Sequence, residues 1–207
     1  MAAHERPKED AAYRCGQCMN GYRDALSLEL LSARLQAERT AGQSTSSTLS
    51  TLASELSAQG KFDEAEPLYR EALELQRETL GSRHPRTLGS INNLGLLLKD
   101  KGDLAAAELL CHEALEVARE TLGDRHPVTI TSFSNLAGLL QAQGNLAAAE
   151  PLFREALEGD RETLGDRHPT TLGSIGNLGR LLKAKRELAA ASAAPAAEPV
   201  GESSTIP

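Results

Sequence analysis

Apolar residues recur through the middle of the chain at intervals of three and four, the spacing typical of one face of an α-helix. One such stripe has charged residues on its other sides and consists of Leu104, Ala107, Leu110, Cys111, Ala114, Leu115 and Ala118. A second stripe lies in the shorter segment before it and consists of Ile91, Leu94, Gly95 and Leu98. The pattern predicts two amphipathic helices that pack as an antiparallel pair.

The same pattern recurs with a period of 42 residues. The copies are "GKFDEAEPLYREALELQRETLGSRHPRTLGSINNLGLLLKDK" from Gly60, "GDLAAAELLCHEALEVARETLGDRHPVTITSFSNLAGLLQAQ" from Gly102 and "GNLAAAEPLFREALEGDRETLGDRHPTTLGSIGNLGRLLKAK" from Gly144. A fourth copy would begin at Arg186. Because repeats of 20–50 residues indicate stacked arrays, we predict an all-α fold, an α-solenoid of antiparallel helix pairs.

Glycine and proline mark the joints between the predicted helices. Gly60, Gly102 and Gly144 fall at the tight turn within each pair. Gly123 falls where a helix end favours a left-handed residue, and Pro127 falls in the first turn of the next helix, where no N–H donor is needed.

Each joint between pairs also contains a histidine in a Gly-x-Arg-His-Pro motif, namely His84, His126 and His168. These residues could be a reactive or metal-binding group used three times, or a structural part of the joint. Packed helices have axes about 8–10 Å apart, whereas a zinc–nitrogen bond is about 2 Å long, so the three cannot bind one ion. We expect the histidines to cap a helix or to hydrogen-bond within the loop.

The repeated residues resemble the tetratricopeptide pattern. The matching positions in the central copy are Leu94 with Gly95 in the first helix, Gly102 at the turn, and Ala107, Ala114 and Leu115 in the second helix. A general unit of this family has 34 residues, and the 42-residue version ending in "ETLG-x-RHP-x-TL" is similar to the repeats of kinesin light chains and nephrocystin-like proteins. The resemblance covers residues 48–190 and implies a right-handed helical superhelix.

The predicted organisation follows from the fit of each segment to this pattern. Residues 1–19 are expected to be a disordered leader, and residues 20–47 a degenerate helix that caps the array. Repeat units follow at about 48–86, 87–128 and 129–170, with a partial unit at 171–190. The segment "RELAAASAAPAAEPVGESSTIP" begins a second helix and then turns into an Ala/Pro/Ser tail, expected to be disordered from 191 to 207.

The last unit is expected to be the weakest. Leu178, Leu181 and Leu182 would be exposed on the last helix unless something covers them, which makes this end a candidate self-association surface. Glycine within a helix costs roughly 0.5–1 kcal/mol relative to alanine, and this region contains Gly159, Gly173, Gly176 and Gly179. We therefore expect the C-terminal half to fray first.

The composition narrows the range of partners and locations. The 207 residues carry a formal net charge of −7, with 3% aromatic residues and no tryptophan. Nucleic-acid and anionic-membrane binders usually carry a basic patch, so neither partner is expected. No apolar run approaches the roughly 20 residues of a membrane span, and "MAAHERPKEDAAYR" does not resemble a secretory signal. With three cysteines, we expect a reducing, cytoplasmic location.

Few residues support metal, redox or catalytic chemistry. "CGQC" contains Cys15 and Cys18 at the spacing of zinc knuckles and thioredoxin-like sites, but no second pair of ligands follows. Cys111 and His112 are adjacent on a predicted helix, so their side chains diverge. No nucleophile elbow, phosphate-binding loop or Ser/His/Asp arrangement is present. We predict no enzymatic activity, no metal and no cofactor, with a C-x-x-C redox or metal site as a minor alternative.

Three asparagines, Asn93, Asn135 and Asn177, also recur every 42 residues, just before the leucine of the shorter helix. The family resemblance implies that they line the concave surface and hydrogen-bond the backbone of an extended peptide. A carboxamide suits this role because it both donates and accepts. A purely structural role is the alternative, because the spacing alone would follow from duplication.

Other residues are predicted to flank these asparagines on the same surface: Asn92, Lys99, Ser134, Gln141, Arg180 and Lys183. Kinesin light chains have a distinctly basic groove for acidic cargo peptides. Here the positive residues cluster in the last unit, and Thr51 replaces the first asparagine. This departure counts against the binding of acidic cargo.

The leading hypothesis is a noncatalytic scaffold whose groove binds an extended peptide or a partner protein, as the resemblance to kinesin light chain cargo adaptors implies. A kinesin-related complex is one expected partner, although residues 1–47 lack the heptad pattern needed to pair with a heavy chain. The alternative hypothesis is an oligomerising regulatory or sensor array that forms part of a larger multidomain protein.

Overall fold

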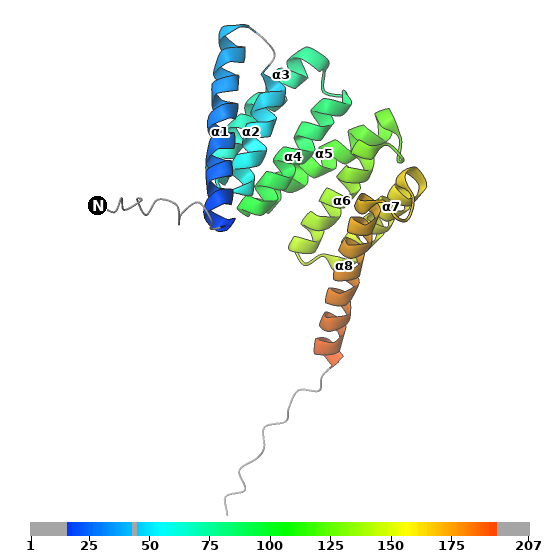
Figure 1. The fold of residues 1–207 in the computed structure, drawn as a ribbon. Helices are drawn as coiled ribbons and strands as arrows, with labels where there is room; N and C mark the ends of the chain where they lie inside the picture. Colours follow the sequence, from blue (N-terminus) through cyan, green and yellow to red (C-terminus); the bar gives the residue numbers. More distant parts are fainter. Residues whose placement is uncertain (1–15, 43–44, 194–207) are drawn as a thin grey trace, which may run out of the picture.

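The computed structural model describes residues 16–42 and 45–193, in which all regular secondary structure is α-helical (Figure 1). The helices are α1 (Gly16–Thr40), α2 (Ser46–Ala58), α3 (Phe62–Leu80), α4 (Pro85–Lys101), α5 (Leu104–Leu122), α6 (Pro127–Ala142), α7 (Leu146–Leu164) and α8 (Pro169–Ala193). The predicted all-α repeat fold is therefore confirmed.

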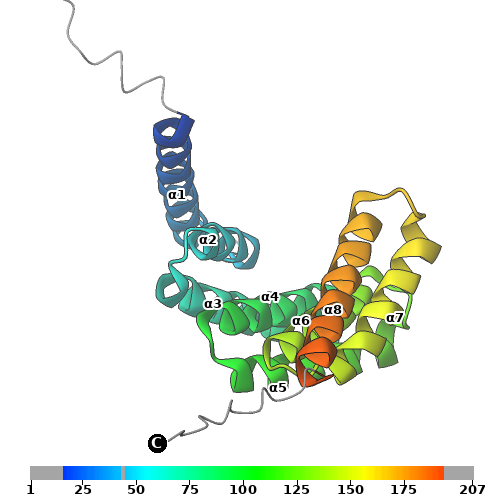
Figure 2. The same ribbon diagram turned by 90° about the horizontal axis from the view of Figure 1, so that it is seen from below.

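The helices alternate between two layers of an open curve. We call α2, α4, α6 and α8 the A helices and α1, α3, α5 and α7 the B helices. Seen from below, the A helices lie toward the inside of the curve and the B helices toward the outside (Figure 2). Helices α1 and α2 form one arm of the curve, and α7 and α8 form the other.

The core consists of the apolar stripes that the sequence pattern predicts. Leu94, Leu98, Cys111 and Ala114 are buried between α4 and α5, as are the other central members of both stripes. Leu104 and Leu110, at the edge, are partly buried and pack against this core. Gly95 brings the two helices close, because a Cβ at this position would lie 3.1 Å from Cys111 Sγ.

The three motif histidines cap three of the A helices, α4, α6 and α8, as expected. His84 Nδ1 accepts a hydrogen bond from the backbone N–H of Arg86 at 3.1 Å, and His126 Nδ1 accepts one from Val128 at 3.2 Å. His168 Nδ1 likewise accepts the Thr170 N–H at 3.2 Å. Each histidine thus satisfies one of the unpaired donors at a helix start.

The two kinds of glycine joint differ in conformation. Gly102, at a turn within a pair, is left-handed with φ 96° and ψ 1°. Gly123 also has a positive φ of 80°, but its ψ of 166° is extended, so the prediction of a left-handed helix cap was wrong there. The extended ψ carries the chain away from the ended helix toward His126 and the next unit. Both conformations favour glycine, which lacks a Cβ.

Polar contacts between neighbouring units repeat with the same period. Lys101 binds Glu66 with an Nζ–Oε2 distance of 2.9 Å, and Gln143 donates to Glu108 at 2.7 Å. Lys185 and Glu150 form the corresponding pair in the last units. Each exposed pair adds little stability, but their equal spacing shows that successive units stack in one register.

The C-terminal helix departs from the prediction of a short helix followed by a new one. Helix α8 runs without a break through Ala193 and includes the segment predicted to start a second helix or a tail. The reason lies at residue 186, where arginine replaces the turn glycine found at Gly60, Gly102 and Gly144. Arginine has no preference for a positive φ, so the helix continues.

The exposed apolar residues of α8 also differ from those predicted. Leu181 is fully buried, and Leu178 and Leu182 are partly buried, whereas Leu172 and Ile175 are exposed. The prediction was wrong for Leu178 and Leu181, because both pack against the core. Leu182 is partly buried and lines a separate hollow of α8.

Helix α1 begins at Gly16, four residues before the segment predicted to be a helix. The remainder of the predicted leader and of the predicted tail lies outside the described residues. So does Cys15 of the C-x-x-C motif.

Candidate functional site

Two hollows lie on the A helices along the inside of the curve. The N-terminal pocket, of about 390 Å³, is lined by Ser47, Ser50, Thr51, Ser54, Gln76, Arg86, Gly89, Ser90 and Asn93. The C-terminal pocket, of about 380 Å³, is lined by Lys99, Ser134, Asn135, Gly138, Gln141, Phe153, Asn177 and Arg180. Most residues of both linings are polar, and we call the inner surface that contains the two pockets the groove.

The C-terminal pocket brings together six of the nine predicted site residues. Helix α4 contributes Lys99, α6 contributes Ser134, Asn135 and Gln141, and α8 contributes Asn177 and Arg180. The repeat explains this convergence, because residues at one register of successive A helices face the same side of the stack.

The charged groups of this pocket already have partners. Arg180 Nη2 donates to Asn177 Oδ1 at 2.5 Å, which fixes the asparagine's carbonyl oxygen and leaves its NH₂ group available to a ligand. Lys99 Nζ lies 3.3 Å from Asp100 Oδ1. Asn135 is half-buried. The pocket therefore offers oriented amide groups, a lysine partly neutralised by a carboxylate, and an arginine whose partner is a neutral amide.

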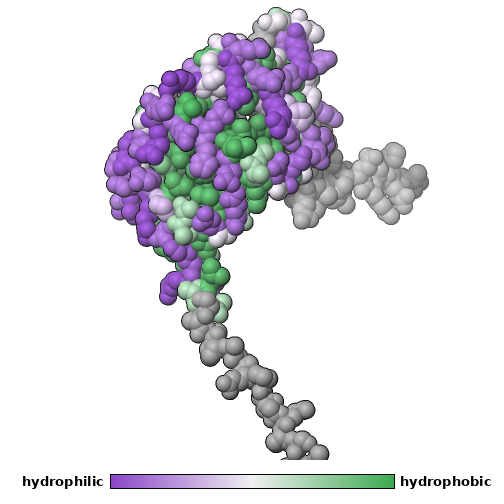
Figure 3. All heavy atoms as spheres, turned by 180° about the vertical axis from the view of Figure 1, so that it is seen from behind, coloured by the Kyte–Doolittle hydropathy of each residue, from purple (hydrophilic) through white to green (hydrophobic). Residues whose placement is uncertain are grey.

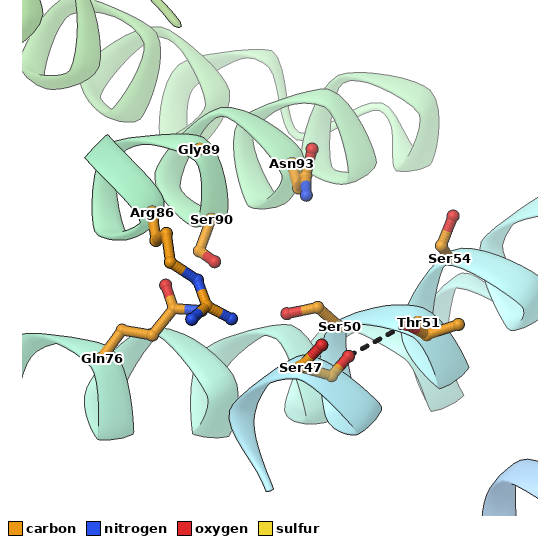
Figure 4. Close-up of a pocket in the computed structure, with 9 residues that line it drawn as sticks. All are labelled: Ser47, Ser50, Thr51, Ser54, Gln76, Arg86, Gly89, Ser90 and Asn93. Atoms are coloured by element: carbon orange, nitrogen blue, oxygen red, sulfur yellow. Dashed lines mark hydrogen bonds between the residues drawn. The ribbon is translucent and has the colours of Figure 1, made fainter. Parts of the chain in front are cut away.

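Asn93 lies in the N-terminal pocket, apart from the other two asparagines (Figure 4). The α2 side of this pocket presents hydroxyl oxygens. Ser50 Oγ donates to Ser46 O at 2.9 Å and Thr51 Oγ1 donates to Ser47 O at 3.0 Å, so both have only lone pairs left for a ligand. Arg86 is the one charged residue in the lining and supplies donors from the opposite side.

Gln76 is an unpaired acceptor in the lining of the N-terminal pocket. Its side chain is buried, and its Oε1 has no hydrogen-bond partner in the described part of the protein. A buried polar atom without a partner costs about 1–3 kcal/mol. A ligand N–H group that reaches Gln76 would therefore remove this cost.

Two predicted site residues do not join the groove. Asn92 is only 2% exposed, and its Nδ2 donates to Ser132 Oγ at 2.7 Å between α4 and α6. The prediction for Asn92 was wrong because neighbouring residues on a helix point about 100° apart, so Asn93 faces the groove and Asn92 the next A helix. Lys183 lies on a separate hollow of α8 with Leu182 and Arg186.

Several lining residues were missed from the sequence. Arg86 and Ser90 lie seven and three residues before Asn93, on one face of α4, so helical spacing from the asparagine could have identified them. Gln76 and Phe153 come from B helices, and no signal within the A-helix pattern indicates that they reach the pockets.

The described residues contain no group of three or more His, Cys, Asp or Glu side chains placed to hold a metal ion. Cys111 is buried against α4, and this burial raises the pKa of its thiol to about 11. It is therefore a packed thiol, not a thiolate at neutral pH. Within residues 16–42 and 45–193, no helix is both long enough and apolar enough to cross a membrane.

A helical array with a polar inner groove defines a repeat scaffold of the kind that binds other proteins. Comparison with known protein families and solved structures agrees with this class. The sequence profile of the tetratricopeptide repeat matches residues 44–110, 88–162 and 131–194. These stretches cover more than half of the chain, so the protein belongs to the tetratricopeptide repeat family.

Solved structures show the same architecture. One is of a Podosopora anserina protein described as a kinesin light chain with nearly identical TPR-like repeats: 27% identity, TM-score 0.65, covering 88% of this chain and 87% of that one. A single-residue variant of it gives 26% identity, a TM-score of 0.66 and the same coverage. BtubC (BKLC) from P. vanneervenii shares the fold at 20% identity and a TM-score of 0.60, covering 96% and 93%. None of the curated proteins compared with the chain matches it.

Proposed function

We propose that the protein is a noncatalytic scaffold whose inner groove binds an extended peptide or a segment of a partner protein. The observation that carries this proposal is the convergence of amide, hydroxyl and cationic side chains from α4, α6 and α8 in the C-terminal pocket. The similarity to a protein described as a kinesin light chain supports a cargo-adaptor role, a kinesin-related complex as the partner and a cytoplasmic location.

The chemistry of the groove suits a peptide backbone. Asn135 and Asn177 each present a group that can pair with a peptide unit whatever its side chain is. In the N-terminal pocket, Ser50, Thr51 and Gln76 offer acceptors for N–H groups, while Arg86 offers donors for carbonyl oxygens. A ligand that spans both pockets would satisfy donors and acceptors along its length.

The proposal is tested by screening the full chain on a peptide array and measuring the affinity of a captured peptide by isothermal titration. A lost hydrogen bond costs roughly 0.5–1.5 kcal/mol, so Asn135→Ala should weaken binding by about two- to tenfold, and Asn93→Ala/Asn135→Ala should weaken it further. Lys183→Ala is the matched control, because Lys183 is an exposed residue outside both pockets. Equal affinity of the peptide for the wild-type protein and the double variant would rule out the groove as the binding site.

A second candidate function is self-association at the C-terminal end of the array. It is favoured by the exposure of Leu172 and Ile175 on the last helix, where the inner units bury the corresponding residues. Light scattering at increasing protein concentration tests it, and a monomer at every concentration would count against it.

A further inference from the structure

Helix α8 has one exposed side. In the inner A helices, the B helix that follows along the chain covers the same side. Ile130 of α6 packs against α7, because a Cβ at Gly159 would lie 2.8 Å from Ile130 Cδ1. Leu88 and Ile130 are 0% and 4% exposed, whereas Leu172, at the same register of α8, is 55% exposed. Ile175 is 39% exposed, while its counterparts Ile91 and Phe133 are buried. Within the described residues, α7 packs on one side of α8, and no B helix covers the side that carries Leu172 and Ile175.

Helix α1 is a B helix that lacks the A helix of its own pair. Leu35 is buried like Leu73, Leu115 and Leu157 of the other B helices. Arg39 binds Glu71 of α3 at 2.6 Å, just as Arg77 binds Glu113 of α5 at 2.9 Å. Helix α1 therefore stacks on α3 as α3 stacks on α5. Helix α2 packs on α1, but among the described residues no other A helix does.

The exposed side of α1 is the side that would meet an A helix. When α1 is aligned with the other B helices through Leu35 and Arg39, Leu30 corresponds to Leu110. Leu110 faces an A helix, because its Cβ would lie 3.7 Å from a Cβ built on Gly95 of α4. Leu110 is partly buried, but Leu30 is 63% exposed. Thus α1 exposes Leu30, which would face an A helix in an inner unit, and α8 exposes Leu172, which would face a B helix.

The lengths of the two helices match as well. Helices α1 and α8 have 25 residues each, whereas the other A helices have at most 17 and the other B helices have 19. Within each complete pair the A and B helices are antiparallel. The additional residues of α8 are at its C-terminus and those of α1 at its N-terminus, so in an antiparallel pair both extensions would lie at the same end and pack on each other.

We propose that α1 of one copy packs on α8 of a second copy and completes its last unit, joining the two copies head to tail. In the register of the inner units, Leu30 of one copy lies next to Gly179 of the other, and Ala37 next to Leu172. The inference rests on the second candidate function, self-association, and specifies its geometry. Because the two joined surfaces differ, the contact can be repeated to give open chains of molecules.

A symmetric contact between two α8 helices fits the surface less well. The uncovered stripe of α8 continues through Gly179, Leu182, Lys183 and Arg186. Lys183 lies 3.8 Å from Glu187 of the same stripe, but two such helices would bring the Arg186 side chains of both copies together, and like charges across an interface are unfavourable. The outer faces of α1 and α8 lie at opposite ends of the curve, so the head-to-tail contact needs no rearrangement within a copy (Figures 1 and 2). The projecting end of α8 shows apolar side chains at its surface (Figure 3).

The test uses the full chain and measures mass by size-exclusion chromatography with light scattering. The wild-type mass should rise with concentration beyond twice the chain mass of 22.0 kDa. Leu30→Glu alone, or Leu172→Glu/Ile175→Glu alone, should remain at 22.0 kDa. An equimolar mixture of the two variants should give a dimer and no larger species, since each keeps one intact surface. The control is Leu109→Glu, a 75% exposed leucine on α5, which should associate like the wild type.

A second measurement does not depend on disrupting the contact. In a chain with Cys15→Ser and Cys18→Ser, the pair Ala37→Cys and Leu172→Cys should form an intermolecular disulfide, while Ala37→Cys with Leu109→Cys should not. Circular dichroism checks that each variant keeps its helix content. A monomer at every concentration without cross-linking would overturn the proposal and self-association together. Association abolished by Leu172→Glu/Ile175→Glu but unchanged by Leu30→Glu would overturn the head-to-tail geometry and leave self-association standing.

Discussion

The repeated histidine is a structural residue in this protein. Nδ1 of His84, His126 and His168 accepts the backbone N–H two residues later, at the first turn of an A helix. The proline that follows needs no acceptor because it has no N–H group, so the cap serves the next donor. This explains why histidine and proline recur together at each joint.

Removing one cap should weaken the fold measurably. We expect His126→Ala to lower the free energy of unfolding by about 1 kcal/mol, the usual cost of a lost helix cap. His126→Asn should retain most of the stability, because the side-chain oxygen of asparagine can accept the hydrogen bond that His126 Nδ1 accepts. Urea unfolding followed by circular dichroism measures both variants. Equal losses for alanine and asparagine would show that packing of the ring, not the cap, is what stabilises the joint.

Cys111 gives the protein a specific dependence on alkaline pH. Burial raises the pKa of its thiol from 9.0 to about 11. The thiol is protonated in both states below pH 9, and between pH 9 and 11 the unfolded chain loses the proton first. The wild type should therefore lose roughly 2 kcal/mol of stability across this range. Burial also raises the pKa of the Tyr69 hydroxyl, so Cys111→Ala should lose the cysteine's part of the slope and keep the tyrosine's part. Parallel pH curves for the two proteins would contradict the assignment.

The helix glycines differ in what surrounds them. A Cβ at Gly173 would meet nothing within 4 Å, whereas one at Gly159 would lie 2.8 Å from Ile130 Cγ1 and Cδ1. Gly159 is thus not only a weak point of α7, as the sequence indicates, but also the space that Ile130 fills. Its counterparts in the other B helices are Leu75 and Val117.

These surroundings predict opposite effects of alanine. Gly173→Ala should stabilise the fold by about 0.5–1 kcal/mol through helix propensity. Gly159→Ala should destabilise it by about 1–3 kcal/mol, because Ile130 must move. In an Ile130→Ala background the penalty of Gly159→Ala should vanish, which a double-mutant cycle measures. A penalty that persists there would place the strain elsewhere.

Most helices follow from the 42-residue period, because each joint has its own residues: glycine within a pair, and histidine with proline between pairs. The length of α8 does not follow from the period, because the period places the start of a fourth copy at Arg186, whereas the lack of a glycine there removes the turn. It also misplaced Asn92, because the repeat gives the period of a residue but not which neighbouring helix it faces. The B-helix residues Gln76 and Phe153 could not be placed in the groove without the packing of the layers.

The stability of the whole array should decrease toward its last unit. Inner helices are covered by neighbours on both sides, while α8 exposes Leu172 and Ile175 and contains three glycines. In stacked repeats each unit contacts only its neighbours, so unfolding can begin at an end. Hydrogen exchange at low protein concentration should therefore show faster exchange in α8 than in α4 or α5. Equal protection of all three would indicate a single cooperative unit.

The contacts between Glu66 and Lys101, Glu108 and Gln143, and Glu150 and Lys185 recur at one constant interval along the chain. Genetic changes that add or remove whole multiples of that interval preserve every such contact. Duplication of residues 102–143 would lengthen the curve and add polar lining to the inner surface, while all existing joints remained intact. An insertion of another length within a helix would break the alignment on both sides. The gene can thus vary the length of its product in whole steps.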